Sequence, residues 1–201
     1  MNGDLLIDVS SVLPYLEQKV RGFFGKDAES EEWARKIRDM TRMATEHAAY
    51  VQCVGMHTPI PIQKIYQPSR LRLGRSGTFP VDLNSLSEGL DGAVVFAGPG
   101  QGKTMLLHSI YTILAKDKDR TPVLFTLRWE GAPDDLVAFV DRLSRQDGGK
   151  QRLVLLVDGY DEITVEERQA VSKSLLLFQS LQRGPFLLTC RTFYDVYDLQ
   201  A

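Results

Sequence analysis

The sequence lacks any long apolar run. No apolar stretch among its 201 residues approaches the roughly 20 residues that a membrane-spanning helix requires. The first residues, MNGDLLIDVSS, have neither the basic segment nor the apolar segment of a secretory signal. We therefore expect neither a membrane span nor export by such a signal.

Cysteine is scarce, and the charges nearly balance. The two cysteines, Cys53 and Cys190, lie far apart and have no metal-binding spacing. Cys190 ends an apolar segment and is expected to be a buried, reduced thiol, which favours a cytoplasmic location. The formal net charge of −2 gives no indication of a nucleic-acid-binding surface. Repeats and low-complexity segments are absent.

A glycine-rich loop follows an apolar segment at residues 94–104, which read VVFAGPGQGKT. Glycine has no Cβ, so this loop can turn its N–H groups inward around phosphate oxygens, and the helix expected after it points its positive end to the same place. The Lys103 ammonium can reach the β- and γ-phosphates, and the Thr104 hydroxyl can ligate Mg²⁺. The expected nucleotide-binding residues of this segment are Gly98, Pro99, Gly100, Gln101, Gly102, Lys103, Thr104 and Met105.

A second apolar segment ends in acids, LVLLVDGYDE at residues 153–162. Asp158, at the carboxyl end of this predicted strand, is placed to hold Mg²⁺ directly or through water. The glycine loop departs from the pattern G-x-x-x-x-G-K-[ST] at Ala97, and a short pattern alone gives false positives. The strand before the loop, the helical pattern after it and the acid-tipped strand favour a nucleotide site over a chance glycine turn.

Predicted strands alternate with helical patterns from residue 92 onward. Strands are expected at 93–97, 122–127, 153–157 and 186–190, and helices at 103–115, 133–143 and 164–182. The last helix opens on a capping box at Thr164. Continuous apolar strands joined by helices predict an α/β fold with a parallel sheet covered on both faces.

A small helical region is expected before this sheet. Apolar residues from Val9 to Phe23 follow helical spacing, and a charged turn is predicted at residues 25–32. A second apolar stripe comprises Trp33, Ile37, Met40, Ala44, His47 and Val51. A packed core histidine is favoured over a ligand for His47. Prolines between residues 52 and 80 predict an extended connector. The predicted organisation is an adaptor, effector or linker region at 1–52, a connector at 53–91 and a partial NTPase core at 92–201.

The acid cluster carries a family resemblance. D-G-Y-D-E at 158–162 places a small residue after the first Asp and then two further acids, whereas a plain Walker B strand needs one or two acids. With AGPGQGKTMLL and LLTCR, this pattern resembles the NACHT domains of STAND signal-transducing P-loop ATPases, and bacterial NLR-like proteins in particular. IYQPSRLRL at 65–73 is similar to the segment that leads into a NACHT domain, and LRWE at 127–130 to the one after its second strand. The resemblance covers residues 50–195.

The resemblance implies an ASCE, AAA+-like P-loop NTPase fold, in which the fourth strand lies between the Walker A and Walker B strands. It implies that Asp161 and Glu162 polarise or position the attacking water, with Glu162 favoured as the base. Arg191 would be the sensor-1 arginine that reads the γ-phosphate, and Tyr66 and Pro68 would lie near the adenine. From the residues alone, Arg191 also fits a surface arginine, Asp161 a helix-start acid, and Tyr66 and Pro68 a brace for the connector.

The implied function is a switch that binds ATP or ADP with Mg²⁺, with GTP as an alternative, and that self-associates in immune or antiviral signalling. The alternatives are a plain turnover ATPase or kinase-like enzyme and a scaffold without hydrolysis. A Ras-type GTPase is disfavoured because no N-K-x-D motif occurs. Relatives continue into a fifth strand, a winged-helix domain and a sensor domain. We therefore expect a fragment with slow or no hydrolysis, the alternative being a natural short form.

Overall fold

The computed structural model describes residues 28–51, 58, 60–61, 70–72, 78–80, 92–117, 119–145 and 152–191. The expected first helical segment, between Val9 and Phe23, and the adenine-side residues Tyr66 and Pro68 lie outside these ranges. His47 lies within a described helix, but its side chain is outside the described part. The predictions for these residues stay predictions.

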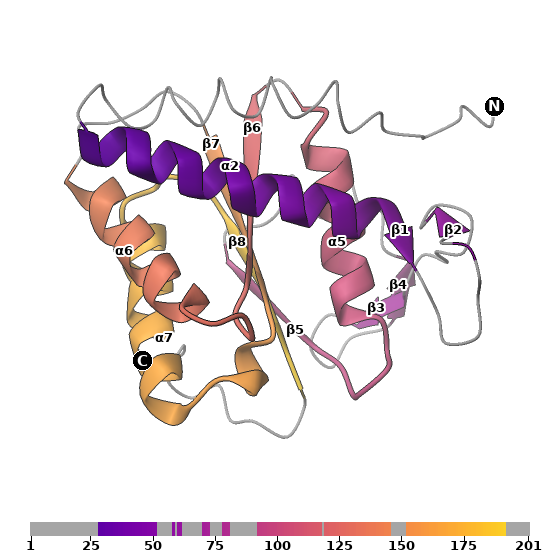
Figure 1. Ribbon diagram of the computed structural model, residues 1–201. Helices are drawn as coiled ribbons and strands as arrows, with labels where there is room; N and C mark the ends of the chain where they lie inside the picture. The colour runs from indigo at the N-terminus through magenta and orange to yellow at the C-terminus, as the bar shows by residue number, and fades with distance from the viewer. Residues whose placement is uncertain are drawn as a thin grey trace.

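A parallel four-stranded sheet forms the centre of the fold (Figure 1). Its strands are β5 (Ala93–Phe96), β6 (Arg120–Thr126), β7 (Arg152–Asp158) and β8 (Phe186–Cys190), in the spatial order β5-β8-β7-β6. All four predicted strands are therefore confirmed to within two residues at each end. The fourth strand lies between the strand that precedes the glycine loop and the strand that ends in Asp158, as expected.

Helices cover both faces of this sheet. They are α5 (Lys103–Leu114) on one face and α6 (Ala132–Ser144) and α7 (Val165–Ser180) on the other (Figure 1). Along β6, Val123 and Phe125 pack with α6 and α7, whereas Leu124 packs with α5. Successive side chains of a strand point to opposite faces, so a strand buried on both faces is apolar throughout. No helix in the described part of the chain is both long and apolar enough to cross a membrane.

The capping box at Thr164 fixes the start of α7. The Thr164 hydroxyl accepts a hydrogen bond from the Glu167 N–H at 3.2 Å, and the Glu167 carboxylate accepts one from the Thr164 N–H at 2.7 Å. Both bonds satisfy donors that a helix start leaves without partners. A short 3₁₀ turn, η1 (Tyr160–Glu162), connects β7 to this helix start. The predicted capping box is thus confirmed, and it stands directly after the acid cluster.

An N-terminal helix, α2 (Ala28–Ala49), packs against the sheet domain. Ile37 is 1% exposed within the larger core cluster, and Trp33 and Met40 pack against that cluster. The Trp33 ring lies 6.2 Å from the Phe139 ring of α6, between centroids. Helix α2 also contacts β6, which is the terminal strand, and α5. It therefore covers the β6 side of the sheet, where an open strand would pair with other chains (Figure 1).

Two sequence predictions about α2 are wrong in part. The predicted charged turn at 25–32 is helical from Ala28 onward, because alanine and glutamate are strong helix formers. Val51 does not continue the helical stripe, since it lies in the short strand β1 (Tyr50–Val51). This strand pairs with β2 (Ile60–Pro61), and β3 (Arg70–Arg72) pairs with β4 (Thr78–Pro80). The described part of the connector is therefore extended, as its prolines predict.

We predict that Ile37→Ala lowers the free energy of unfolding by about 2–4 kcal/mol, because it leaves a cavity in the core that α2 shares with the sheet. Chemical denaturation measures this change. The control is Met43→Ala, on the same helix but 37% exposed, which is expected to have little effect. Equal stability of the Ile37 variant and the wild-type protein would contradict the packing of α2 described above.

Candidate functional site

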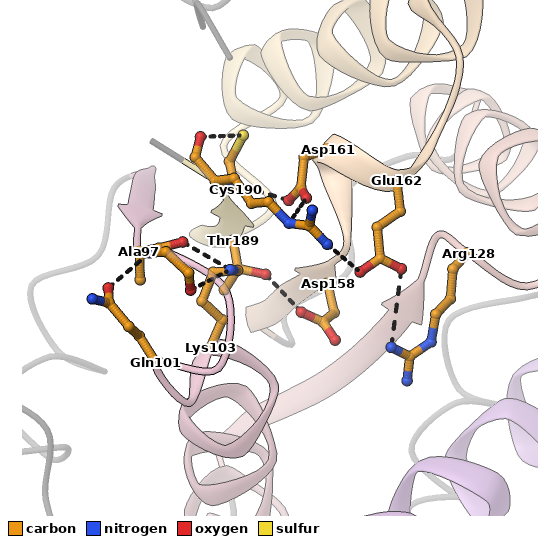
Figure 2. A network of polar contacts seen from close by, with 11 residues as sticks. Ala97, Gln101, Lys103, Arg128, Asp158, Asp161, Glu162, Thr189 and Cys190 are labelled. Carbon is orange, nitrogen blue, oxygen red and sulfur yellow. Dashed lines mark hydrogen bonds and ion pairs between the residues drawn. The ribbon is translucent and has the colours of Figure 1, made fainter. Parts of the chain in front are cut away.

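The carboxyl ends of the central strands meet at one edge of the sheet. Phe96 of β5 is paired with Cys190 of β8, and Val157 of β7 with Leu188 of β8. The glycine loop after β5 and the acids after β7 therefore lie on either side of the end of β8, as Figure 2 shows. In open α/β sheets, ligands bind outside the carboxyl ends of the strands.

The loop uses the conformational freedom of glycine at two of its three positions. Gly100 and Gly102 have φ angles of 72° and 81°, which side chains with a Cβ rarely adopt. Gly98 has no positive φ, and a Cβ there would meet only the Gln101 side chain, at 3.4 Å. The prediction that Gly98 is needed for loop conformation is therefore not supported by its backbone angle. Ala97 continues the sheet ladder, since its N–H donates to the Cys190 carbonyl at 3.1 Å.

The loop wraps around the Lys103 ammonium. Lys103 Nζ donates to the carbonyl oxygens of Ala97 at 2.8 Å and Gly98 at 3.2 Å. The Gln101 side-chain oxygen accepts a hydrogen bond from the Gly98 N–H at 2.7 Å (Figure 2). The Lys103 ammonium and the Gly98 N–H donor thus lie within one loop. A cation and backbone N–H donors in one loop favour an anion.

The start of α5 has no acidic side chain and no side-chain cap. Its first turn contains no acidic residue, and no described side chain accepts a hydrogen bond from its first N–H groups. The other two helices of the sheet domain differ, because α6 has Asp134 and Asp135 in its first turn and α7 has Glu166 and Glu167. Uncapped N–H groups and the positive end of the helix dipole favour phosphate at this position.

Asp158 lies at the end of β7 and is 4% exposed. Its Oδ2 accepts a hydrogen bond from the Thr104 hydroxyl at 2.8 Å, and its Oδ1 accepts one from the Thr189 hydroxyl at 2.7 Å. No ion pair among the described residues includes Asp158. Among the described residues, neutral hydroxyls alone hold this buried carboxylate; such a group is costly without a positive charge, so a bound cation would stabilise it.

The oxygen donors at Asp158 fit Mg²⁺. Among the described residues there is no cluster of three or more histidines, cysteines or acids that would hold a metal alone. Mg²⁺ is usually held by one or two carboxylates together with phosphate oxygens and waters. Asp158 and Thr104 are therefore the residues that would hold Mg²⁺ beside a phosphate. The sequence-based assignment of Mg²⁺ to them stays a prediction.

Asp161 and Arg191 form a closed pair. The Asp161 side chain is 2% exposed; Oδ1 accepts the Arg191 backbone N–H at 3.1 Å, and Oδ2 lies 2.7 Å from Arg191 Nε. Both carboxylate oxygens are thus used to hold the end of β8. This geometry assigns Asp161 to positioning Arg191 and does not favour it as a base. The same contacts show that Arg191, whose side chain is 42% exposed, is held by a buried carboxylate, unlike a free surface arginine.

Glu162 lies between two arginines. Its Oε1 is 4.0 Å from Arg191 Nη2, and its Oε2 is 4.0 Å from Arg128 Nη1 (Figure 2). The Glu162 side chain is 34% exposed and folds over Gly159, whose φ is 82°. Asp161, Arg191, Glu162 and Arg128 therefore form a chain of alternating charges. Of the two acids after Asp158, only Glu162 has a carboxylate with access to water.

Cys190 is a buried thiol, as predicted. Burial raises its pKa to about 11, and the nearby Asp161 carboxylate adds to the increase. The thiol is therefore protonated at neutral pH. Since the thiolate is the nucleophilic form, this environment argues against nucleophilic chemistry by Cys190.

The structure brings together Lys103, Thr104, Asp158, Asp161, Glu162 and Arg191, which the sequence singles out. Pro99 is exposed and Met105 is half-buried in the first turn of α5. Two residues of the site were not predicted. Thr189 is the single hydroxyl within the apolar strand FLLTC, which is a usable signal. Arg128 belongs to the LRWE segment, but its sequence position alone indicates no role.

Comparisons of this chain with protein-family models, with curated proteins and with solved structures found no match.

We predict that Arg191→Ala lowers the free energy of unfolding by about 1–3 kcal/mol, because it leaves the buried Asp161 carboxylate without its charged donor. The control is Arg128→Ala, whose guanidinium is half-exposed and lies 4.0 Å from its partner, with an expected loss below about 1 kcal/mol. Urea denaturation compares the two variants. A larger loss for Arg128→Ala than for Arg191→Ala would contradict the deeper burial of the pair between Asp161 and Arg191.

Proposed function

We propose that this chain is the nucleotide-binding module of a P-loop NTPase switch of the NACHT and STAND type. It binds ATP or ADP with Mg²⁺ and hydrolyses ATP slowly. The hydrogen bond between Thr104 and Asp158 carries the proposal. It joins the residue after the glycine loop to the acid at the end of another strand, which is the pairing that a Mg²⁺-nucleotide requires.

The phosphates bind at the glycine loop. The Lys103 ammonium turns from the carbonyls of Ala97 and Gly98 toward the β- and γ-phosphate oxygens, and the uncapped N–H groups of α5 donate to them. The Gly98 N–H exchanges the Gln101 oxygen for a phosphate oxygen. When bound at Thr104 and Asp158, Mg²⁺ neutralises charge on the β- and γ-phosphates.

Hydrolysis uses the chain of charges at the ends of β7 and β8. Glu162, the acid with access to water, accepts a proton from the attacking water. Arg191, fixed by Asp161, directs its exposed guanidinium toward the γ-phosphate and stabilises charge there. The half-exposed Arg128 lies on the other side of Glu162 and helps to orient it.

The wider role proposed for the module is signalling by nucleotide-dependent self-association in the cytoplasm, in immune or antiviral defence. The support is the sequence resemblance described above, together with the strand order that it implies. A ligand that binds two conformations unequally shifts their populations, so exchange of ADP for ATP would drive the assembly. ATP is proposed over GTP because the sequence has no N-K-x-D motif.

Analysis of the nucleotide released by heat from the purified protein tests the proposal. Retained ADP or ATP is expected, with slow turnover of added ATP in the presence of Mg²⁺. Rapid turnover would favour a plain ATPase. If neither ATP, ADP nor GTP binds in calorimetry with Mg²⁺, the chain is a scaffold and the proposal fails.

Lys103→Ala should weaken ADP binding by about 2–4 kcal/mol, because the variant lacks a charge-assisted contact to phosphate in a half-buried loop. Calorimetry measures the affinity. Lys173→Ala, an exposed lysine of α7, provides the control for loss of one positive charge. Equal affinities for the Lys103 variant and the wild-type protein would remove the assignment of the phosphate loop.

Glu162→Gln should retain ATP binding and lower the rate of hydrolysis by about 10²–10⁴-fold. Glutamine keeps the shape of the side chain but does not accept the proton from water. Single-turnover measurements with excess protein give the rate, and Glu166→Gln, an exposed acid at the start of α7, is the matched control. A wild-type rate for Glu162→Gln would transfer the role of base to another group.

A further inference from the structure

Two threonines from different elements hold the two oxygens of Asp158. Thr104 of α5 donates to Oδ2 at 2.8 Å. Thr189 of β8 donates to Oδ1 at 2.7 Å (Figure 2). The pairing of Val157 with Leu188 brings the next residues of both strands, Asp158 and Thr189, side by side. Both are buried, at 4% and 0% exposure. The phosphate loop and the chain of charges described above do not account for Thr189.

We propose that Thr189 is a positioning residue that fixes the rotation of the Asp158 carboxylate and thereby sets the affinity of the site for Mg²⁺-nucleotide. This inference rests on the proposed function. Rotation about the last side-chain bond of an aspartate is only weakly restricted. A short hydrogen bond from a hydroxyl to a carboxylate, with the β-branched Thr189 as donor, restricts that rotation strongly.

The direction of the two hydrogen bonds explains what this fixed rotation achieves. A hydroxyl has one proton and two lone pairs. With Oδ1 occupied by Thr189, Oδ2 remains the oxygen that faces Thr104. Thr104 donates its proton to Oδ2 and keeps its lone pairs available for a cation. Residues that orient metal ligands in this way typically change metal affinity by about 10–100-fold when they are replaced.

A second buried threonine of the same sheet shows that burial alone does not produce this contact. Thr121 of β6 is also 0% exposed, and its hydroxyl has no hydrogen-bond partner within the described part of the chain. Threonine and valine have nearly the same shape. Thr121→Val therefore tests the effect of the same substitution in the same sheet without a link to Asp158.

The experiment measures ADP affinity of the wild-type protein, Thr189→Val and Thr121→Val by calorimetry, with Mg²⁺ and with EDTA. We expect Thr189→Val to weaken ADP binding in Mg²⁺ by about 10–100-fold and to leave the affinity in EDTA unchanged. Thr121→Val should match the wild-type protein in both buffers. Thr189→Ser, which keeps the donor, should restore the affinity in Mg²⁺.

The inference is overturned if the ADP affinity of Thr189→Val depends on Mg²⁺ to the same extent as that of the wild-type protein. It is also overturned if Thr189→Val loses ADP affinity equally in Mg²⁺ and in EDTA. If circular dichroism shows that Thr189→Val is unfolded, Thr189→Cys replaces it, because a thiol is a weaker hydrogen-bond donor than a hydroxyl. The inference is also overturned if the ADP affinity of Thr189→Cys depends on Mg²⁺ as that of the wild-type protein does. If the wild-type protein binds ADP in neither buffer, the proposed function fails and the inference fails with it.

Discussion

The position of β8 between β5 and β7 is the constraint on which the candidate site depends. These three strands are far apart in the sequence, and their parallel pairing aligns their carboxyl ends. The pairing brings Arg191 beside the acids after β7 and Thr189 beside Asp158. Because neighbouring strands lie roughly 5 Å apart, a central β8 is within hydrogen-bond reach of both neighbours. If β8 lay at the edge of the sheet, Arg191 would be close to only one of the two segments, the glycine loop after β5 or the acids after β7.

Local sequence signals predicted much of this arrangement. Apolar runs marked the four strands because a parallel strand is buried on both faces. Thr164 predicted the start of α7 because capping is a contact over three residues. Positions set by long-range packing were harder. Nothing near Asp161 in the sequence reveals that both its oxygens would bind Arg191, the residue that directly follows β8, 30 residues later.

The two unpredicted residues of the site illustrate the same limit. Thr189 and Thr121 are both fully buried threonines in strands, but only Thr189 has a carboxylate placed beside it by the neighbouring strand. Arg128 follows β6 at the far edge of the sheet, and its closeness to Glu162 depends on a turn after β7. The resemblance implied the strand order, and the strand order brings the elements that carry these residues together. Which side chains then contact one another depends on their three-dimensional arrangement, which no local sequence pattern encodes.

The burial of α2 has a consequence for how this helix can move relative to the sheet. Ile37 shares a core with Phe139 and the strands, so separating α2 from the sheet would expose apolar surface and leave β6 unprotected. That cost favours motion of α2 and the sheet as one rigid body. Helix α2 would then keep its orientation relative to the sheet and move together with it.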